Sequence, residues 1–195
     1  MNKYKVIAIC GKSASGKDTL LQRIIASNHE LHKIIGCTTR PPREGEVHGK
    51  DYFFLSLLEF AAQHLDSNML EISKFREWYY GTSFESLNEN AINIGIFNPT
   101  GIYALMNNEA VDLFVVQVHA SDKTRLMRSL KREINPDVDE IVRRYLTDKE
   151  DFEFFSQTYE PDYIFDSEGV NWLDMDLVAQ EIVLRARAHW AEEAN

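Results

Sequence analysis

The stretch YKVIAICGKSASGKDTL, residues 4–20, decides the fold. Its first part is short and almost wholly apolar, with β-branched Val6, Ile7 and Ile9, which is typical of a buried strand in a parallel sheet. Its second part has the spacing Gly-x-x-x-x-Gly-Lys, and apolar side chains then recur at helical spacing. A strand, a glycine-rich loop and a helix in this order favour a loop that binds phosphate groups.

The chemistry of this loop suits an anion. Gly11 and Gly16 let the backbone turn so that successive N–H groups face one point, and the start of the next helix adds its positive dipole end. Lys17 can reach the terminal phosphates of a nucleotide as a flexible point charge. We therefore predict a nucleotide site on this loop.

One position departs from the usual pattern. Asp18 stands where such loops place a Ser or Thr whose hydroxyl binds Mg²⁺. A carboxylate is also a hard oxygen ligand, so Asp18 can hold the ion directly or through water. The other interpretation is an acidic residue that only complements the helix dipole. The residues alone leave both interpretations open.

The charge balance narrows the possible partners. The chain of 195 residues has 21 Lys and Arg against 31 Asp and Glu, a formal net charge of -10, which argues against a nucleic-acid polymer as ligand. Its 2 cysteines and 6 scattered histidines have no spacing typical of a disulfide scaffold or a zinc site. The apolar runs are too short for a signal peptide or a membrane span, so we expect a cytoplasmic protein without membrane contact.

A second cluster of charge lies in TTRPPREGEVHGKDYFF, residues 38–54. Arg40 and Arg43, with Tyr52 nearby, can hold several oxygens of one phosphate. A phosphate loop and a separate phosphate clamp imply two anionic ligands, which phosphoryl transfer between nucleotides requires.

Apolar strand-like segments alternate with helical ones along the chain, which favours an α/β fold with a mainly parallel sheet. Further strands are expected within 33–40, 51–55, 69–75, 76–83, 91–97, 111–121 and 162–167, and the apolar run 111–121 is expected to be central. Helices are expected at 56–67, 125–134, 138–159 and 172–190. Ser56 is a candidate cap of the first, with Glu59 three residues later, and the last should pack on the sheet.

Residues 38–52 resemble the guanylate kinase family, whose fingerprint T-T-R-x-P-R-x-G-E-x-x-G-x-x-Y they match. The stretch LEISKFREWYYGTS, residues 70–83, is similar to the family's second nucleotide-binding stretch. The order of the motifs agrees over nearly the whole chain. The resemblance implies one domain with a three-layer P-loop NTPase core, a nucleoside-monophosphate-binding insertion and a lid. Their expected ranges are 1–36, 85–126 and 159–195 for the core, 37–84 for the insertion and 127–158 for the lid.

The resemblance also implies site residues. For ATP they are Gly11, Ser13, Ala14, Ser15, Gly16, Lys17, Asp18 and Thr19. For GMP they are Arg40, Arg43, Tyr52, Glu71, Tyr80, Thr82 and Asn98. The residues expected to act on the transferred group are Lys17, Arg40, Arg128, Arg132 and Arg144. Physical chemistry agrees at Glu71, because a carboxylate that meets the adjacent N1–H and 2-amino donors favours guanine over adenine.

The chain departs from the family at two further places. Gly36 stands where the family often has a serine that touches guanine. The stretch IGIFNPTG, residues 94–101, aligns with the family's D-x-D-x-Q-G, so Ile96 and Asn98 replace two acids and Thr100 replaces glutamine. We hypothesise that Asp18 compensates as an acidic metal ligand. Alternatively, the base specificity differs and the amide of Asn98 recognises another group.

We therefore expect Mg²⁺-dependent transfer of a phosphoryl group from ATP to GMP or dGMP, in line and without a general base. Two alternatives stay open. A kinase for another nucleoside monophosphate is favoured by Ile96 and Asn98 and opposed by Glu71. A guanylate-kinase-like binding module without activity is the other. A GTPase is disfavoured because the base-reading motif N-K-x-D is missing. The sequence does not determine ribose preference or oligomeric state.

Overall fold

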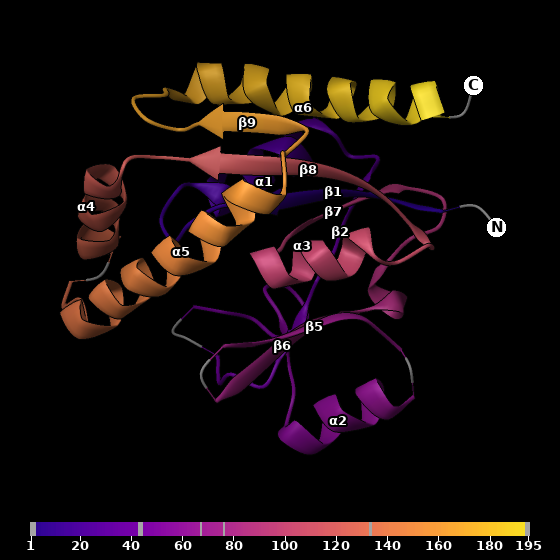
Figure 1. Cartoon of the computed structure of the whole chain (residues 1–195), viewed down its shortest axis with the longest axis horizontal. Helices are drawn as coiled ribbons and strands as arrows, with labels where there is room; N and C mark the ends of the chain where they lie inside the picture. The colour runs from indigo at the N-terminus through magenta and orange to yellow at the C-terminus, as the bar shows by residue number, and fades with distance from the viewer. Residues whose placement is uncertain (1–2, 43–44, 67, 76, 133, 194–195) are drawn as a thin grey trace. The chain divides into compact units, whose positions relative to one another are not determined.

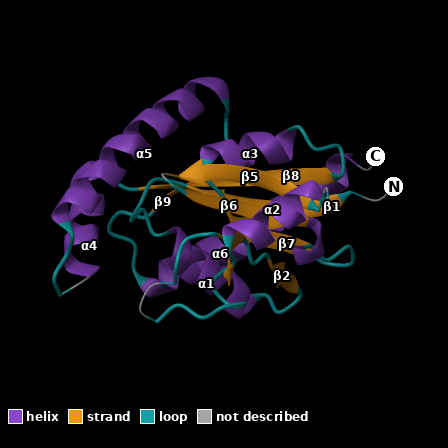
Figure 2. Ribbon diagram, turned by 90° about the horizontal axis from the view of Figure 1, so that it is seen from below, coloured by secondary structure: helices purple, strands orange, loops and turns teal. Residues whose placement is uncertain are grey.

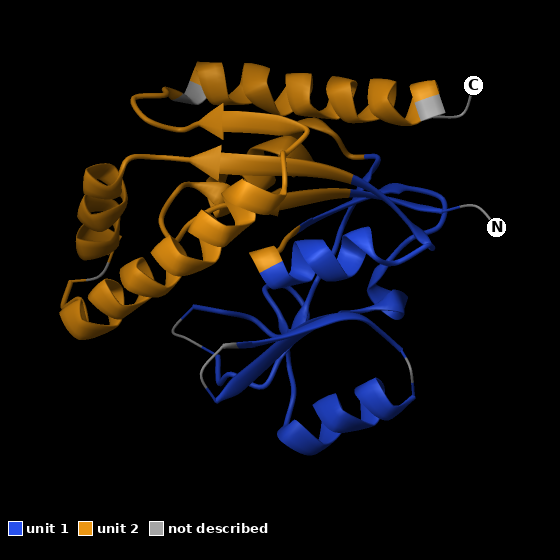
Figure 3. Cartoon of the chain, in the orientation of Figure 1, with its two compact units in different colours: residues 1–6, 30–95, 100–113 blue, residues 7–29, 96–99, 114–195 orange. Residues whose placement is uncertain are grey.

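The computed structural model describes residues 3–42, 45–66, 68–75, 77–132 and 134–193. The chain forms two compact units, which Figure 3 colours separately. The first unit comprises residues 1–6, 30–95 and 100–113, and the second comprises residues 7–29, 96–99 and 114–195. The predicted division into a core and two insertions stays a prediction.

A five-stranded sheet has the strand order β2-β7-β1-β8-β9, and both β2–β7 and β8–β9 pair in parallel (Figure 1). Its strands are β1 (Tyr4–Cys10), β2 (Leu31–Lys33), β7 (Ile92–Ile96), β8 (Val111–His119) and β9 (Tyr163–Asp166). Residues Val6 to Cys10 of β1 are completely buried, which explains their unbroken apolar run. The expected α/β class with a mainly parallel sheet is confirmed. The apolar strand β8 lies inside the sheet beside β1, which holds the central place.

The first unit also contains a four-stranded sheet in the order β4-β3-β6-β5. Its strands are β3 (Cys37–Thr38), β4 (Phe53–Phe54), β5 (Met69–Phe75) and β6 (Trp78–Ser83), and a 3₁₀ turn, η1 (Phe84–Ser86), follows. The stretch 33–40, in which one short strand was expected, is divided. Lys33 ends β2 of one sheet, and Cys37 begins β3 of the other.

Helix α2 (Leu57–Leu65) of the first unit begins as expected. The Glu59 N–H donates to Ser56 Oγ at 3.2 Å and the Ser56 N–H donates to Glu59 Oε2 at 2.7 Å, so the predicted capping box is confirmed. The helix packs on the small sheet through Phe60, whose ring centroid lies 5.7 Å from that of Tyr79 in β6.

The sequence analysis missed helix α3 (Pro99–Met106) of the chain. Its signals are Pro99 at the first helical position and the buried residues Ile102 and Leu105, spaced by three. Only a strand at 91–97 was expected here, with no helix after it.

In the second unit, α1 (Lys17–Ser27) packs against α6 (Trp172–Glu193), where Arg23 Nη1 and Asp176 Oδ1 are 3.3 Å apart. Helix α6 runs along β8 and β9 (Figure 1), and the rings of Trp190 and Phe114 lie 6.5 Å apart. The expectation that the last helix packs on the sheet is confirmed.

Helices α4 (Asp122–Arg132) and α5 (Val138–Thr158) also belong to the second unit. The two helices lie next to each other in Figure 2. They pack together, and the Tyr145 hydroxyl of α5 donates to Asp122 Oδ2 of α4 at 2.7 Å. Within the described ranges, none of the helices combines the length and apolar character that a membrane span requires.

Candidate functional site

The phosphate loop lies between β1 and α1 in the second unit. Gly16 has φ 105°, and Gly11 has φ 148°. A β-carbon at Gly11 would lie 2.4 Å from the Val118 carbonyl oxygen, so no other residue fits there. The predicted need for glycine at these positions therefore has a physical cause in the backbone.

Ala14 is the one described non-glycine residue with positive φ, at 59°. The left-handed region is unfavourable for a residue with a β-carbon and usually marks a functional site. The turn is closed by the Ser15 N–H, which donates to the Lys12 carbonyl at 3.1 Å. The Ser15 hydroxyl is buried and has no hydrogen-bond partner among the described residues. Both features are typical of a loop shaped for a ligand.

Lys17 keeps its side chain at this loop. Its Nζ donates to the Lys12 carbonyl at 3.0 Å. Burial lowers the pKa of Lys17, and the nearby carboxylates of Asp18 and Asp148 oppose that shift. A partly desolvated ammonium attracts a phosphate more strongly than an exposed one does.

Asp18 is exposed in the first turn of α1, and Thr19 beside it is half-buried. Across the described ranges, no three side chains of His, Cys, Asp or Glu gather to hold a metal ion. The exposed carboxylate of Asp18 is a hard oxygen ligand of the kind that fits Mg²⁺, an ion that usually takes its other ligands from phosphates and water. Asp18 as a metal ligand stays a prediction.

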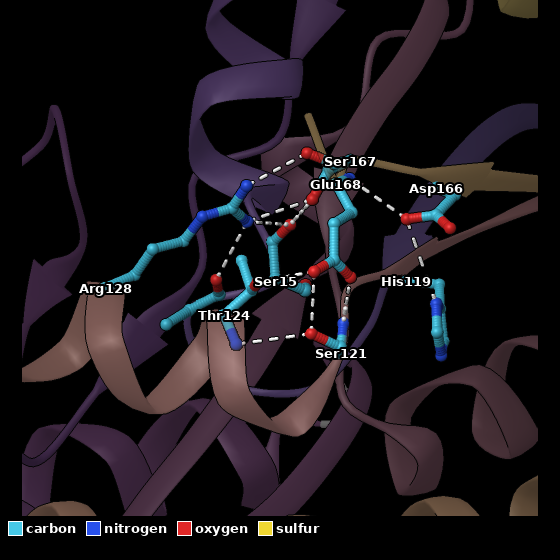
Figure 4. A network of polar contacts seen from close by, with 9 residues as sticks. Ser15, His119, Ser121, Thr124, Arg128, Asp166, Ser167 and Glu168 are labelled. Carbon is cyan, nitrogen blue, oxygen red and sulfur yellow. Dashed lines mark hydrogen bonds and ion pairs between the residues drawn. The ribbon is translucent and has the colours of Figure 1, made fainter. Parts of the chain in front are cut away.

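Of the three expected lid arginines, Arg128 lies at the loop (Figure 4). Its Nη1 donates to the carbonyls of Ala14 and Ser15 at 3.3 and 3.2 Å, and to Ser167 Oγ at 2.9 Å. Arg132 is exposed at the end of α4. Arg144 pairs with Glu140 at 2.7 Å, as does Arg143. Their roles in transfer stay predictions.

Glu168 fixes the position of α4 relative to the turn after β9 (Figure 4). It accepts hydrogen bonds from the Ser121 N–H at 3.0 Å, from Ser121 Oγ at 2.8 Å and from Thr124 Oγ1 at 2.7 Å. The bonds from Thr124 and Ser121 lower the pKa of Glu168. This network supports the helix that carries Arg128.

The sequence analysis missed Arg125 and Asp148. Arg125 is 2% exposed and donates from Nε to the Ser13 carbonyl at 3.0 Å. Asp148 accepts from the Ser13 N–H at 2.6 Å and from Arg125 Nη2 at 2.8 Å. The available signal was spacing, because Arg125 and Arg128 are three apart and share one face of α4. Nothing in the local sequence of Asp148 pointed to the loop.

The acceptor cluster, named for the residues predicted to bind GMP, lies at the small sheet of the first unit. In it, Arg40 follows β3, Tyr52 precedes β4 and Tyr80 belongs to β6. Arg40 is 3% exposed, and its guanidinium carbon lies 5.8 Å from the ring centroid of Tyr52. The rings of Tyr52 and Tyr80 are 6.0 Å apart, edge to face. Burial opposes the charge of Arg40, but Glu46 at 2.9 Å and Tyr80 leave its pKa raised. The structure thus brings together three of the residues predicted for the acceptor phosphate.

Glu71 and Thr82 form a second pair on the same sheet. The antiparallel register of β5 and β6 sets them opposite each other, and Thr82 Oγ1 donates to Glu71 Oε1 at 2.8 Å. The two residues are 8% and 3% exposed. Burial raises the pKa of Glu71 to about 7, although the bond from Thr82 lowers it. A buried carboxylate with such a partner has acceptor capacity left for a ligand.

Arg43 lies outside the described residues. Asn98 is exposed, follows β7 and belongs to the second unit. Its predicted role in reading the base stays a prediction.

Comparison with known proteins identifies one family. The sequence model of the guanylate kinase family matches residues 3–171. The chain is 43% identical over 83 residues to the guanylate kinase of Prochlorococcus marinus, which is 42% of this chain and 45% of that protein. It is 30% identical over 159 residues to the guanylate kinase of Caldanaerobacter subterraneus subsp. tengcongensis, 78% of this chain and 75% of that protein. The chain thus spans under half the length of the first of these relatives.

The fold agrees with a solved structure. The crystal structure of guanylate kinase from Anaplasma phagocytophilum matches with a TM-score of 0.63 and 18% identity, over 96% of this chain and 87% of that one. At this identity the likeness shows the fold alone, which is the expected one. The family match, in contrast, extends from before the phosphate loop to beyond β9. The chain belongs to the guanylate kinase family.

Proposed function

We propose that the protein transfers the terminal phosphoryl group of ATP to GMP or dGMP, producing ADP and GDP or dGDP. The observation that carries this proposal is the buried pair of Glu71 and Thr82. The pair lies on the same sheet as β3, and Arg40 follows β3 in the chain. A buried carboxylate is costly unless a ligand or a protein group satisfies it. Guanine offers two adjacent donors to it, while the unprotonated N1 of adenine would leave it partly unpaired.

The acceptor phosphate is held, in this proposal, by Arg40, Tyr52 and Tyr80. The guanidinium provides donors in a fixed fork, and the two hydroxyls add polar contacts. Arg43 completes the expected clamp. Because the acceptor phosphate is already an anion, it needs no general base to act as the nucleophile.

The donor side works through position and charge. The loop from Gly11 to Thr19 binds the phosphates of ATP, and Lys17 neutralises charge that develops on the transferred group. We further propose that Arg128, Arg132 and Arg144 add positive charge when the nucleotide is bound. A bound Mg²⁺ would supply further neutralisation, and Asp18 is the residue we propose to hold it.

A product assay tests the proposal directly. Purified protein, ATP and Mg²⁺ are mixed in turn with GMP, dGMP, AMP, dAMP, CMP, UMP or dTMP, and diphosphates are separated by chromatography. Diphosphate formed from GMP and dGMP only is the expected result. A Lys17→Met variant serves as the inactive control.

The other outcomes identify the alternatives. Diphosphate from a nucleotide with another base would overturn the guanine assignment and favour a kinase of different specificity. The observation that favours this alternative is that Ile96 and Asn98 replace two acids of the family motif. No diphosphate from any acceptor, in protein shown to be folded, would favour a binding module without activity.

A further inference from the structure

The buried guanidinium of Arg125 needs a physical reason. Its Nη1 bonds Asp122 at 2.9 Å, its Nη2 bonds Asp148 at 2.8 Å, and its guanidinium carbon lies 5.5 Å from the ring centroid of Tyr145. Replacing a buried ion cluster with well-packed apolar residues is often neutral or stabilising, so stability is weak grounds for such a group. Arg125 also contacts the phosphate loop, and this contact is a better explanation for its burial.

Arg125 and Asp148 both form hydrogen bonds with the backbone of one loop residue, Ser13. The Ser13 carbonyl accepts from Arg125 Nε at 3.0 Å, and the Ser13 N–H donates to Asp148 Oδ2 at 2.6 Å. Both polar groups of this backbone unit are therefore bound by side chains that also bind each other. The two side chains come from different helices, α4 and α5. Ser13 can move only if this pair moves or breaks.

The next residue is the strained one. Ala14 has φ 59°, which a residue with a β-carbon keeps only when its surroundings impose it. On its other side, the Ala14 and Ser15 carbonyls accept from Arg128 Nη1 at 3.3 and 3.2 Å. The backbone is thus held on both sides of the Ala14 Cα: at Ser13 by Arg125 and Asp148, and at the Ala14 and Ser15 carbonyls by Arg128.

We propose that Arg125 and Asp148 are positioning residues for the donor site: they hold Ser13, and through it the strained Ala14, so that the following N–H groups face the nucleotide phosphates. The proposal rests on the proposed function for the identity of the ligand. Asp148 acts through Ser13 rather than on the nucleotide, because its own negative charge would repel a phosphate.

Binding of ADP with Mg²⁺, measured by isothermal titration calorimetry, tests this assignment. Asp148→Ala is expected to raise the Kd for ADP about tenfold, since a charge-assisted hydrogen bond to the loop is lost. Asp148→Asn keeps an acceptor oxygen and should have a smaller effect. Glu150→Gln removes a carboxylate from an exposed position of the same helix and should leave the Kd unchanged.

A rescue experiment separates positioning from simple structural support. Glycine adopts positive φ without external support. Adding Ala14→Gly to Asp148→Ala should therefore restore most of the lost ADP affinity. A helix-packing role for Asp148 would give no such rescue. If Asp148→Ala fails to fold, as judged by its thermal transition, Asp148→Asn with and without Ala14→Gly carries the same test.

The outcomes are distinguishable. Equal Kd values for ADP in the wild type, Asp148→Ala and Asp148→Asn overturn the positioning role and leave the proposed function intact. A loss of affinity that Ala14→Gly does not restore also overturns it. A wild-type protein that binds no ADP overturns the proposed function and this inference together.

Discussion

The two candidate anion sites of this protein are built in opposite ways. In the first unit, charged side chains line a small sheet, and Glu71 meets its partner Thr82 across neighbouring strands. In the second unit, the groups that we propose to face the ligand belong to the backbone of a loop, and side chains distant in the sequence hold that loop. Arg125 bonds a residue 112 positions earlier, and Asp148 bonds one 135 positions earlier.

This difference determines which substitutions should affect each site. The acceptor cluster depends on the chemistry of individual side chains, so a substitution there should change which ligand binds. The phosphate loop depends on conformation, so changes outside the loop should alter how tightly the donor binds while the acceptor site keeps its specificity.

The largest effect is expected at Lys17. Lys17→Met removes the ammonium from the loop, and we expect kcat to fall about a thousandfold because charge on the transferred group is no longer neutralised. A coupled assay of ADP formation measures this loss. Lys131→Met, at an exposed position of α4, is the matched control. Weakened GMP binding by Lys17→Met, measured without ATP, would show that the two sites are not separate.

Asp18 comes next. Asp18→Ala should lower Mg²⁺-dependent turnover about a hundredfold, since one carboxylate ligand is lost, and Asp18→Ser should keep part of the activity through its hydroxyl. Titration of activity against Mg²⁺ concentration measures the change. Identical Mg²⁺ dependence in the wild type and both variants would show that Asp18 does not bind the ion and only complements the dipole of α1.

Glu71 tests the acceptor side. Glu71→Gln should lower kcat/KM for GMP about tenfold or more and reduce the preference over AMP, because one acceptor oxygen for guanine is lost. In the wild type, kcat/KM for GMP should rise with pH through about 7, where Glu71 becomes a carboxylate. The phosphate of GMP itself titrates near pH 6, and this affects the wild type and Glu71→Gln equally. The ratio of their kcat/KM values at each pH therefore isolates the titration of Glu71. A pH-independent ratio would contradict this role.

The same pKa has a consequence for stability. The folded pKa of Glu71, about 7, lies above the ordinary 4.5, so the folded protein binds the proton more tightly than the unfolded chain. The contribution of this proton binding to the free energy of unfolding is therefore fully present below about pH 4.5 and is lost as the pH rises through about 7. Measured by thermal unfolding, the wild type should lose stability relative to Glu71→Gln between these values.

The smallest effect is expected at the capping box of α2. Ser56→Ala should lower the stability of the protein by about 1 kcal/mol, which shifts Tm by about 2–4 °C. Ser156→Ala, at an exposed hydroxyl of α5, is the control and should shift Tm less. Because Ser56 is outside both sites, a changed KM for ATP in Ser56→Ala would contradict the separation of the units.

How far the sequence could predict these features depends on the span of the contacts. The fold class follows from the buried run of β1 and the loop after it, and the capping box from Ser56 and Glu59, which are local patterns. The acceptor cluster was expected mainly because residues 38–52 and 70–83 resemble motifs of the guanylate kinase family, whereas the residues alone indicated only Arg40, Arg43 and Tyr52. Arg125 and Asp148 were not predicted, because only tertiary packing brings them to Ser13.

Helix α3 illustrates another cause. Its signals, Pro99 and the spacing of Ile102 and Leu105, were present in the sequence. They are weak signals, because a helix of eight residues has only about two turns in which apolar spacing can repeat. The division of 33–40 between two sheets, in contrast, has no local signal beyond Gly36, because a change of sheet depends on pairing partners elsewhere in the chain.

The small size of β3 and β4, two residues each, has a dynamic consequence. Such strands contribute few cross-strand hydrogen bonds, whereas β1 is completely buried from Val6 to Cys10. The backbone amides around Arg40 and Tyr52 should therefore exchange with deuterium much faster than those of β1. A ligand that binds Arg40 should slow that exchange. The exchange rate of these amides would therefore show whether the acceptor cluster is occupied.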